Sequence, residues 1–176
     1  MLTPIKDNIP HSLRHIPQWV CWLAVPRDNG KISKIPVSAA PNCPGVPASV
    51  DKFATWTNFE TAWAYYERNQ GRRLRIANKT GTLSGVGIVL TRELGLLGVD
   101  LDNAIEGSQM KTWARDLVTK ARTYAELSPS GRGIRMFTKG TLPWDGKRTG
   151  DIEIYTAGRF LTLTGHRLAQ GLSDVG

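Results

Sequence analysis

Apolar side chains recur at helical spacing in two segments of the chain, residues 56–66 and about 108–124. In the first segment, Thr57 or Asn58 is placed to cap the opening turn and Gly71 to end the helix. We interpret the aromatic stripe of this helix as core and not as a platform for stacking bases. The pattern therefore predicts two amphipathic helices.

Other segments alternate with a period of two or form short apolar runs, as strands do. Residues 18–25 and 31–37 flank the turn-forming stretch 27–30 and predict a hairpin. We expect three more antiparallel pairs: 85–90 with 96–102, 123–127 with 134–139, and 151–155 with 159–164. Because helices interleave with strands joined by short turns, the pattern predicts an α+β fold with a mostly antiparallel sheet.

The chain divides into three parts by composition. Residues 1–17, with three prolines, predict an extended lead-in; residues 18–168 form a single domain; and residues 169–176 are a polar tail. With 40% hydrophobic residues and six Trp in 176 residues, the chain has enough apolar material for one core.

The charge balance favours a polyanionic partner. The net charge is +8, which indicates nucleic acid or nucleotide as the ligand class. Residues 111–148 hold nine Lys or Arg against three acids and supply +6 of that charge. We interpret a second basic cluster as a solvated loop: Arg68, Arg72, Arg73 and Arg75.

The remaining composition excludes several classes of protein. Cys21 and Cys43 are too few for a disulfide framework and lack zinc-ligand spacing, which favours a reducing cytoplasmic setting. No apolar run is long enough to cross a bilayer, so no membrane partner is expected. His166 has no second His or Cys nearby and is expected on the surface or in a structural role.

An apolar run ends in two carboxylates one residue apart, Asp100 and Asp102. Alternate residues of a strand share a face, so the two acids repel each other unless a cation lies between them. The pair therefore predicts a site for Mg²⁺ or Mn²⁺, the alternative being a strand end that points two acids into water. Glu153 is a third candidate ligand, although Asp151 shares its face and spacing alone does not choose between them.

A turn rich in small residues follows, Ser-Pro-Ser-Gly-Arg-Gly-Ile at 128–134. Its glycines, the hydroxyls of Ser128 and Ser130, and the arginines Arg132 and Arg135 suit phosphate oxygens, although such a stretch can also be only a turn. No GK[ST] sequence follows the glycines, so an ATPase motor is not indicated.

The order of these motifs resembles the archaeo-eukaryotic primase superfamily, and most closely the primase-polymerase (prim-pol) domains of phages, plasmids and other mobile elements. The resemblance rests on the Asp-x-Asp strand, the turn at 128–134, the Ile-Glu-Ile-Tyr strand at 152–155 and the Gly-Arg-Phe that follows it, and it spans residues 16–168. It implies an RRM-like sheet with flanking helices. It also implies that Asp100, Asp102 and Glu153 are the catalytic and metal-binding acids.

The chain departs from the family at Arg135, which stands where the family has a histidine near the incoming nucleotide. Arginine can hold a phosphate through its two-pronged guanidinium, but it does not give up a proton near neutral pH. Nucleotide binding is therefore expected here, and proton transfer is not. The candidate nucleotide-binding residues are Ser128, Ser130, Gly131, Arg135, Arg159, Lys34 and Lys147.

The resemblance implies a template-dependent nucleotidyltransferase: a primase, a DNA polymerase, or both, using Mg²⁺ or Mn²⁺ and nucleoside triphosphates. The expected partners are single-stranded DNA template or primer-template, and a helicase domain or protein of the same replication system. Two alternatives stay open. A non-catalytic RRM-like module would bind single-stranded or origin DNA, and a metal-dependent nuclease would use the same acids for hydrolysis.

Overall fold

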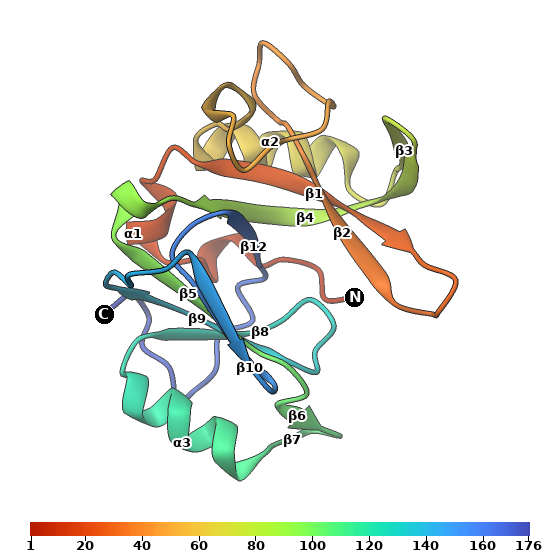
Figure 1. Cartoon of the computed structure of the whole chain (residues 1–176). Helices are drawn as coiled ribbons and strands as arrows, with labels where there is room; N and C mark the ends of the chain where they lie inside the picture. Colours follow the sequence, from red (N-terminus) through yellow and green to blue (C-terminus); the bar gives the residue numbers. More distant parts are fainter.

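The computed structural model, which describes residues 1–176, stacks two helices and two five-stranded sheets in four layers (Figure 1). Helix α2 (Phe59–Asn69) covers the first sheet, and helix α3 (Thr112–Ala121) covers the far side of the second sheet. The remaining elements are short: η1 (Lys6–Asn8), α1 (His11–Arg14), η2 (Phe53–Thr55), η3 (Arg92–Leu94) and the small hairpin β6 (Ile105–Glu106) and β7 (Gln109–Met110).

Every strand pair in the two sheets is antiparallel. The first sheet runs β12-β4-β1-β2, with β3 also paired to β4, and the second runs β10-β11-β5-β9-β8. The first sheet contains β1 (Trp19–Pro26), β2 (Ile32–Val37), β3 (Arg73–Ile76), β4 (Lys79–Leu90) and β12 (Arg159–Leu163). The second contains β5 (Leu96–Leu101), β8 (Tyr124–Leu127), β9 (Ile134–Lys139), β10 (Gly146–Thr149) and β11 (Ile152–Tyr155). The α+β class predicted from the sequence is confirmed.

Helix α2 forms where the first apolar stripe predicts it. The side chain of Asn58 accepts a hydrogen bond from the Thr61 backbone N–H at 2.9 Å, which caps the first turn. Gly71, at a φ of +74°, takes the left-handed conformation just after the helix. From Phe59 on, the stripe is buried, and the Phe59 ring lies 4.8 Å from that of Trp19 on β1, whereas Trp56 precedes the helix and is half-buried. These aromatic side chains are core, as predicted.

Helix α3 is shorter than the sequence pattern indicates. Met110 and Tyr124 both fit the apolar stripe, but Met110 belongs to β7 and Tyr124 to β8. Arg122, at a φ of +47°, ends the helix and turns the chain into β8. The prediction of a helix over 108–124 is therefore wrong at both ends.

The two sheets are in close contact where Gly98 on β5 faces Leu161 on β12. A Cβ atom at position 98 would lie 2.1 Å from Leu161 Cδ1 and 2.9 Å from Leu90 Cδ1. Tyr124 and Phe137, both fully buried, extend this contact across β8 and β9. Glycine at position 98 thus allows the apolar part of the second sheet to pack against the first.

Two predicted strand pairs are wrong because the chain changes sheets at both connections. After β4 the chain passes through η3 and Gly95, at a φ of +58°, and β5 enters the second sheet and not a hairpin with β4. After β11, the Thr156 N–H and hydroxyl hydrogen-bond to backbone oxygens near β10, and β12 then pairs with β4. The β1–β2 and β8–β9 pairs are confirmed.

Two further segments differ from their predictions. Residues 1–17 are not simply extended, because η1 and α1 form there and bury Ile9 and Leu13 in the main core. Of the second basic cluster, Arg68 lies in the last turn of α2, and Arg73 and Arg75 lie on β3 and not in a loop. No helix of the structure is long and apolar enough to cross a membrane.

Candidate functional site

A row of charged residues crosses the second sheet on one face. The strand register pairs Arg148 with Glu153, Glu153 with Asp100, Asp100 with Arg135, and Arg135 with Glu126. Residues paired across neighbouring strands point to the same side of a sheet. One residue from each of the five strands therefore contributes to a single charged row.

The opposite face of the same strands is apolar and packs against α3. Leu101, Ile134, Met136 and Ala125 alternate with the charged residues and join the buried cluster under that helix. Burying these alternate positions fixes the register of each strand, because a shift by one residue would turn the charges into the core. The apolar face thus places the acids on the side that looks toward the first sheet.

Asp102 lies one residue beyond the end of β5, near the charged row. Its backbone N–H donates to the Asp151 carbonyl at 2.7 Å, which brings the chain after β5 against the turn before β11. The pKa of Asp102 is raised by burial first and then by the charges of Asp100 and Glu153. The structure therefore brings Asp100, Asp102 and Glu153 together. Asp151 is instead in the turn, where it accepts a hydrogen bond from Asn103 at 3.1 Å.

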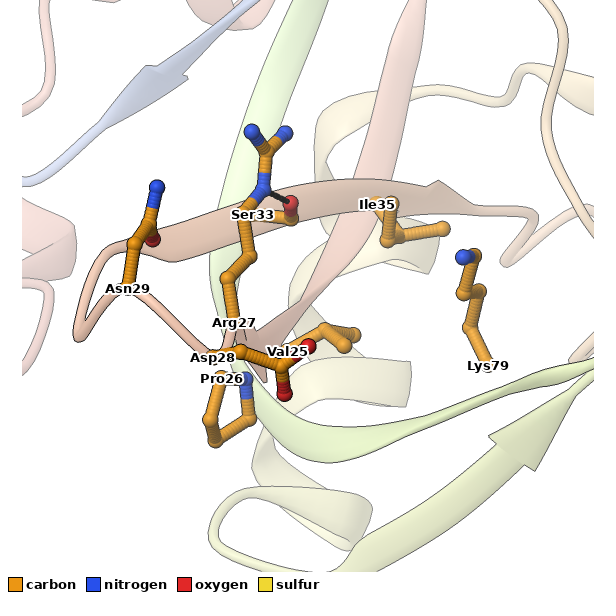
Figure 2. Close-up of a pocket in the computed structure, with 8 residues that line it drawn as sticks. All are labelled: Val25, Pro26, Arg27, Asp28, Asn29, Ser33, Ile35 and Lys79. Atoms are coloured by element: carbon orange, nitrogen blue, oxygen red, sulfur yellow. Dashed lines mark hydrogen bonds between the residues drawn. The ribbon is translucent and has the colours of Figure 1, made fainter.

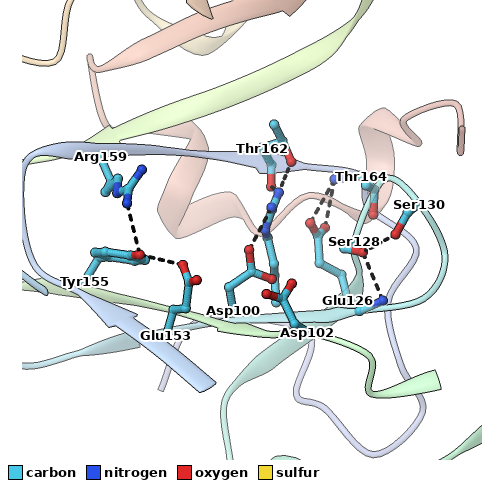
Figure 3. Close-up of polar contacts among 12 residues, drawn as sticks. Asp100, Asp102, Glu126, Ser128, Ser130, Glu153, Tyr155, Arg159, Thr162 and Thr164 are labelled. Atoms are coloured by element: carbon cyan, nitrogen blue, oxygen red, sulfur yellow. Dashed lines mark hydrogen bonds and ion pairs between the residues drawn. The ribbon is translucent and has the colours of Figure 1, made fainter. Parts of the chain in front are cut away.

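Arg135 is a buried partner of Asp100. Its Nη2 donates to Asp100 Oδ2 at 3.0 Å, and its Nη1 donates to the carbonyl oxygen and hydroxyl of Thr162 on β12 (Figure 3). Its side chain is 4% exposed, and its Nε has no hydrogen-bond partner. The guanidinium therefore has protein partners on both sides. It orients Asp100 on the second sheet and links it to Thr162 on the first sheet.

Glu126, on β8, is the last residue of the charged row and lies inside the protein. This fully buried carboxylate accepts hydrogen bonds from the backbone N–H groups of Thr164 and Gly165 and from the Tyr124 hydroxyl. Burial raises the pKa of Glu126, and these donors partly offset the effect. The contacts fix the chain just after β12 and so hold Thr162 in place for Arg135.

Glu153 is bound by two neighbours at the other end of the row. The Tyr155 hydroxyl donates to Glu153 Oε2, and Arg159 Nη2 donates to that hydroxyl at 3.3 Å (Figure 3). Arg148 Nη1 lies 2.8 Å from Glu153 Oε1, and its Nη2 lies 3.5 Å from Asp102 Oδ2. Arg148 therefore bridges two of the three acids.

Two small cavities adjoin the charged row. A cavity of about 180 Å³ is bordered by Tyr155, Arg159 and Phe160, and one of about 130 Å³ is lined only by polar residues. Three residues line both cavities: Lys34, Asp100 and Arg135. Lys34 reaches this position from β2, so the first sheet supplies a cation opposite the acids. Burial, followed by the charge of Arg135, lowers the pKa of Lys34 to about 8.

The turn between β8 and β9 forms the wall of the smaller cavity. Ser128, Ser130 and Arg132 line it. The Ser128 hydroxyl accepts a hydrogen bond from the Gly133 N–H at 3.1 Å and lies 3.1 Å from the Ser130 hydroxyl. Gly131 takes a φ of +72° at the tip. The two hydroxyls are thus held side by side at the edge of a polar cavity, a position that suits phosphate oxygens.

Some candidate residues are not brought to this site. Lys147 pairs with Ile154, so it points away from the charged row, and its ammonium lies 5.8 Å from the Trp144 ring centroid. The basic segment 111–148 is also divided, because its residues on α3 lie beyond the apolar face of the second sheet. The Nε2 atom of His166 lies 2.9 Å from the Thr3 carbonyl oxygen.

The largest cavity lies elsewhere, at the β1–β2 hairpin. It has a volume of about 570 Å³ and contains one carboxylate, Asp28, together with Arg27 and Lys79 (Figure 2). Arg27 donates to the Ser33 hydroxyl within it. No group of acids is present there, so this cavity does not compete with the charged row as a site for chemistry.

The acids fit a hard cation by the chemistry of their donors. Carboxylate oxygens are the ligands that Mg²⁺ and Mn²⁺ prefer, and the like charges beside Asp102 would be relieved by such an ion. As the side chains stand, no three acidic, His or Cys residues are placed to hold one ion in common. Arg135 holds Asp100, and Arg148 bridges the other two acids. The carboxylates must turn out of these contacts to share an ion.

Several residues of the site escaped the sequence interpretation. Arg148 and Tyr155 contact Glu153, and Thr162 holds Arg135. For Arg148 a signal exists, because Gly150 and Asp151 form a two-residue turn that pairs Thr149 with Ile152 and hence position 148 with position 153. The other contacts depend on how the two sheets pack.

An antiparallel α+β domain with acids on one sheet, beside a Ser/Gly turn, is the arrangement that the motif order implied for the primase-polymerase class. Comparison with known proteins supports that class. The chain is 32% identical over 172 residues, 93% of its length, to the DNA primase-polymerase of Nitratiruptor phage NrS-1. This similarity supports a primase-polymerase domain of phage type.

The chain spans 21% of the length of that phage protein. No family model matches the chain.

Proposed function

We propose that this domain is the catalytic part of a template-dependent nucleotidyltransferase that acts as a DNA primase, a DNA polymerase, or both. The observation that carries the proposal is the register that sets Asp100 beside Glu153, with Asp102 next to them, at the edge of a polar cavity. The similarity to a phage DNA primase-polymerase over almost the whole chain supports it.

Asp100, Asp102 and Glu153 would hold Mg²⁺ or Mn²⁺ during the reaction. Bound there, the ions would activate the attacking 3′-hydroxyl and stabilise the leaving pyrophosphate. Arg135 keeps Asp100 oriented from within the protein through its contacts with Thr162. It does not take part in proton transfer, because its guanidinium stays charged.

The nucleoside triphosphate would lie across the two cavities that share Lys34. Ser128, Ser130 and Arg132 face the polar cavity and would contact the phosphate oxygens, while Tyr155 and Arg159 border the other cavity. Lys34, charged below its lowered pKa of about 8, would neutralise phosphate from the first sheet. Binding thus orients the substrate between the two sheets.

The proposed partner is single-stranded DNA template or primer-template, in keeping with the net charge of +8. We place the domain in the cytoplasm, in the replication system of a phage or another mobile element, where a helicase would open the duplex.

A gel assay tests the proposal. Purified protein is incubated with single-stranded template, labelled dNTPs or NTPs and either Mg²⁺ or Mn²⁺, with and without an annealed primer. We expect products that require template, nucleotide and metal together. Asp100→Ala, Asp102→Ala and Glu153→Ala should each abolish them, with circular dichroism showing an unchanged fold. Full activity in any of the three folded variants would refute the assigned site.

The contacts between the acids and two arginines favour one alternative, a module that binds DNA without catalysis. Such a module would keep Asp100 and Glu153 permanently paired, as they are in this structure. Calorimetry with a nucleoside triphosphate and Mn²⁺ separates the two. The enzyme should bind the nucleotide in a metal-dependent way, and the binding module should bind DNA alone.

A further inference from the structure

Each of the three acids of the site is paired with an arginine. Asp100 is paired with Arg135 at 3.0 Å, Glu153 with Arg148 at 2.8 Å, and Asp102 with Arg148 at 3.5 Å. Two arginine side chains therefore lie where a shared cation would have to compete for the same oxygen atoms.

The two arginines differ in how firmly they are held. Arg135 lies on the central strand β9, is 4% exposed and is bound to Thr162 of the other sheet. Arg148 lies on the edge strand β10, all of whose residues are exposed, and its side chain is 61% exposed. Besides the acids, Arg148 has a hydrogen bond from its Nε to the Gly150 carbonyl at 3.2 Å. Arg135 is thus fixed in the protein interior, whereas the side chain of Arg148 can leave its partners and enter solvent.

Binding of Arg148 opposes binding of a cation at Asp102 and Glu153. The guanidinium lies 2.8 Å from Glu153 Oε1 and 3.5 Å from Asp102 Oδ2, so its positive charge repels a second cation at these oxygens. Exposed ion pairs contribute little to stability, so the guanidinium is easily replaced by a doubly charged ion. Without either cation, the acids would face one another uncompensated.

We propose that Arg148 is a built-in counter-ion that competes with the divalent cation: it bridges Asp102 and Glu153 in the metal-free domain and is displaced when the ion binds. This inference rests on the proposed function, because it takes the acid cluster as the cation site. In this proposal Arg148 lowers the affinity of the site for the cation and has no part in the chemical step.

The chain provides a matched control one residue away. Lys147 carries the same charge on the same exposed strand, but its register partner is Ile154, so it points to the other side. Arg148→Gln and Lys147→Gln remove one positive charge each. They differ in whether the lost group touches the acids.

The experiment measures the dissociation constant of Mn²⁺, added as MnCl₂ to the purified full chain, from the electron paramagnetic resonance signal of the free ion. Arg148→Gln should bind Mn²⁺ about two- to fivefold more tightly than the unchanged protein, the range that corresponds to an exposed ion pair. Lys147→Gln should leave the affinity unchanged. In EDTA, Arg148→Gln should lower the unfolding temperature by about 1–3 °C, and saturating Mn²⁺ should remove the difference.

Two outcomes would overturn the inference while leaving the cation site in place. Equal or weaker Mn²⁺ binding by Arg148→Gln would show that Arg148 does not compete. Equal tightening in both variants would show an effect of net charge alone. Asp102→Asn separates these outcomes from failure of the proposed function. If it leaves Mn²⁺ affinity unchanged, the cluster is not the cation site and both proposals fall.

Discussion

One face of the second sheet packs apolar side chains against α3, whereas the other turns a row of charges toward the first sheet. Neighbouring residues of one strand point to opposite faces. On β9, Met136 points to the apolar face and Arg135 to the charged face. The apolar face is continuous with a core, and the charged face borders two small cavities, one of them polar. We infer that stability and chemistry are carried by alternate residues of the same strands.

Met136→Ala tests the apolar face and should give the largest change in stability. Met136 is 4% exposed in the cluster under α3. Truncating a buried Met costs about 2–5 kcal/mol. Urea unfolding should show this loss, whereas the folded protein should keep its primer-extension rate.

Lys139→Ala, on the exposed end of the same strand, should change the free energy of unfolding by less than about 0.5 kcal/mol. A large loss of activity without a loss of stability in Met136→Ala would contradict the division between faces.

Gly98→Ala tests the contact between the sheets and should have a smaller effect. The new methyl group would lie 2.1 Å from Leu161 Cδ1, so one side chain must move. Overpacking of this kind costs about 1–3 kcal/mol in unfolding free energy. Leu161→Val in the same chain shortens the opposing side chain. The double variant should therefore lose less than the sum of the two single losses, and strict additivity would refute the assigned contact.

The pH dependence of nucleotide binding tests the contribution of Lys34 to the charged face. We expect this effect to be the smallest of the three. Its pKa is lowered to about 8, mainly by burial, so its positive charge is present below that pH and is lost as pH rises through it. The KM for nucleoside triphosphate should rise a few-fold between about pH 7 and about pH 9. Lys34→Arg keeps its charge over this range and should show a flatter profile. An identical rise in both proteins would assign the effect to another group.

The parts of the fold that follow from local signals could be predicted. The β1–β2 hairpin has its turn chemistry between the strands, and α2 has Asn58 as its cap. The partners of β5 and β12 could not be predicted, because a short connection between two apolar runs looks the same whether the chain folds back or crosses to another sheet. Only the packing around Gly98 and Leu161 decides between them.

The candidate site divides in the same way. The period of a strand placed Asp100 and Asp102 on one side, but the choice between Asp151 and Glu153 required the register of β11 against β5. Arg135 was expected to hold a phosphate, whereas the structure turns its guanidinium to Asp100 and Thr162. That contact joins residues from different sheets, so it could not be predicted from their spacing along the chain.

The order of strands also has a consequence during synthesis on the ribosome. Asp100 and Asp102 emerge early, but Glu153 comes with β11 and Thr162 with β12, which pair with strands made about 50 to 80 residues before them. A nascent chain that has not reached residue 162 therefore lacks the contact between Thr162 and Arg135, the residue that holds Asp100. In the proposed function, the acid cluster therefore reaches its final arrangement only after β12 has been translated and docked.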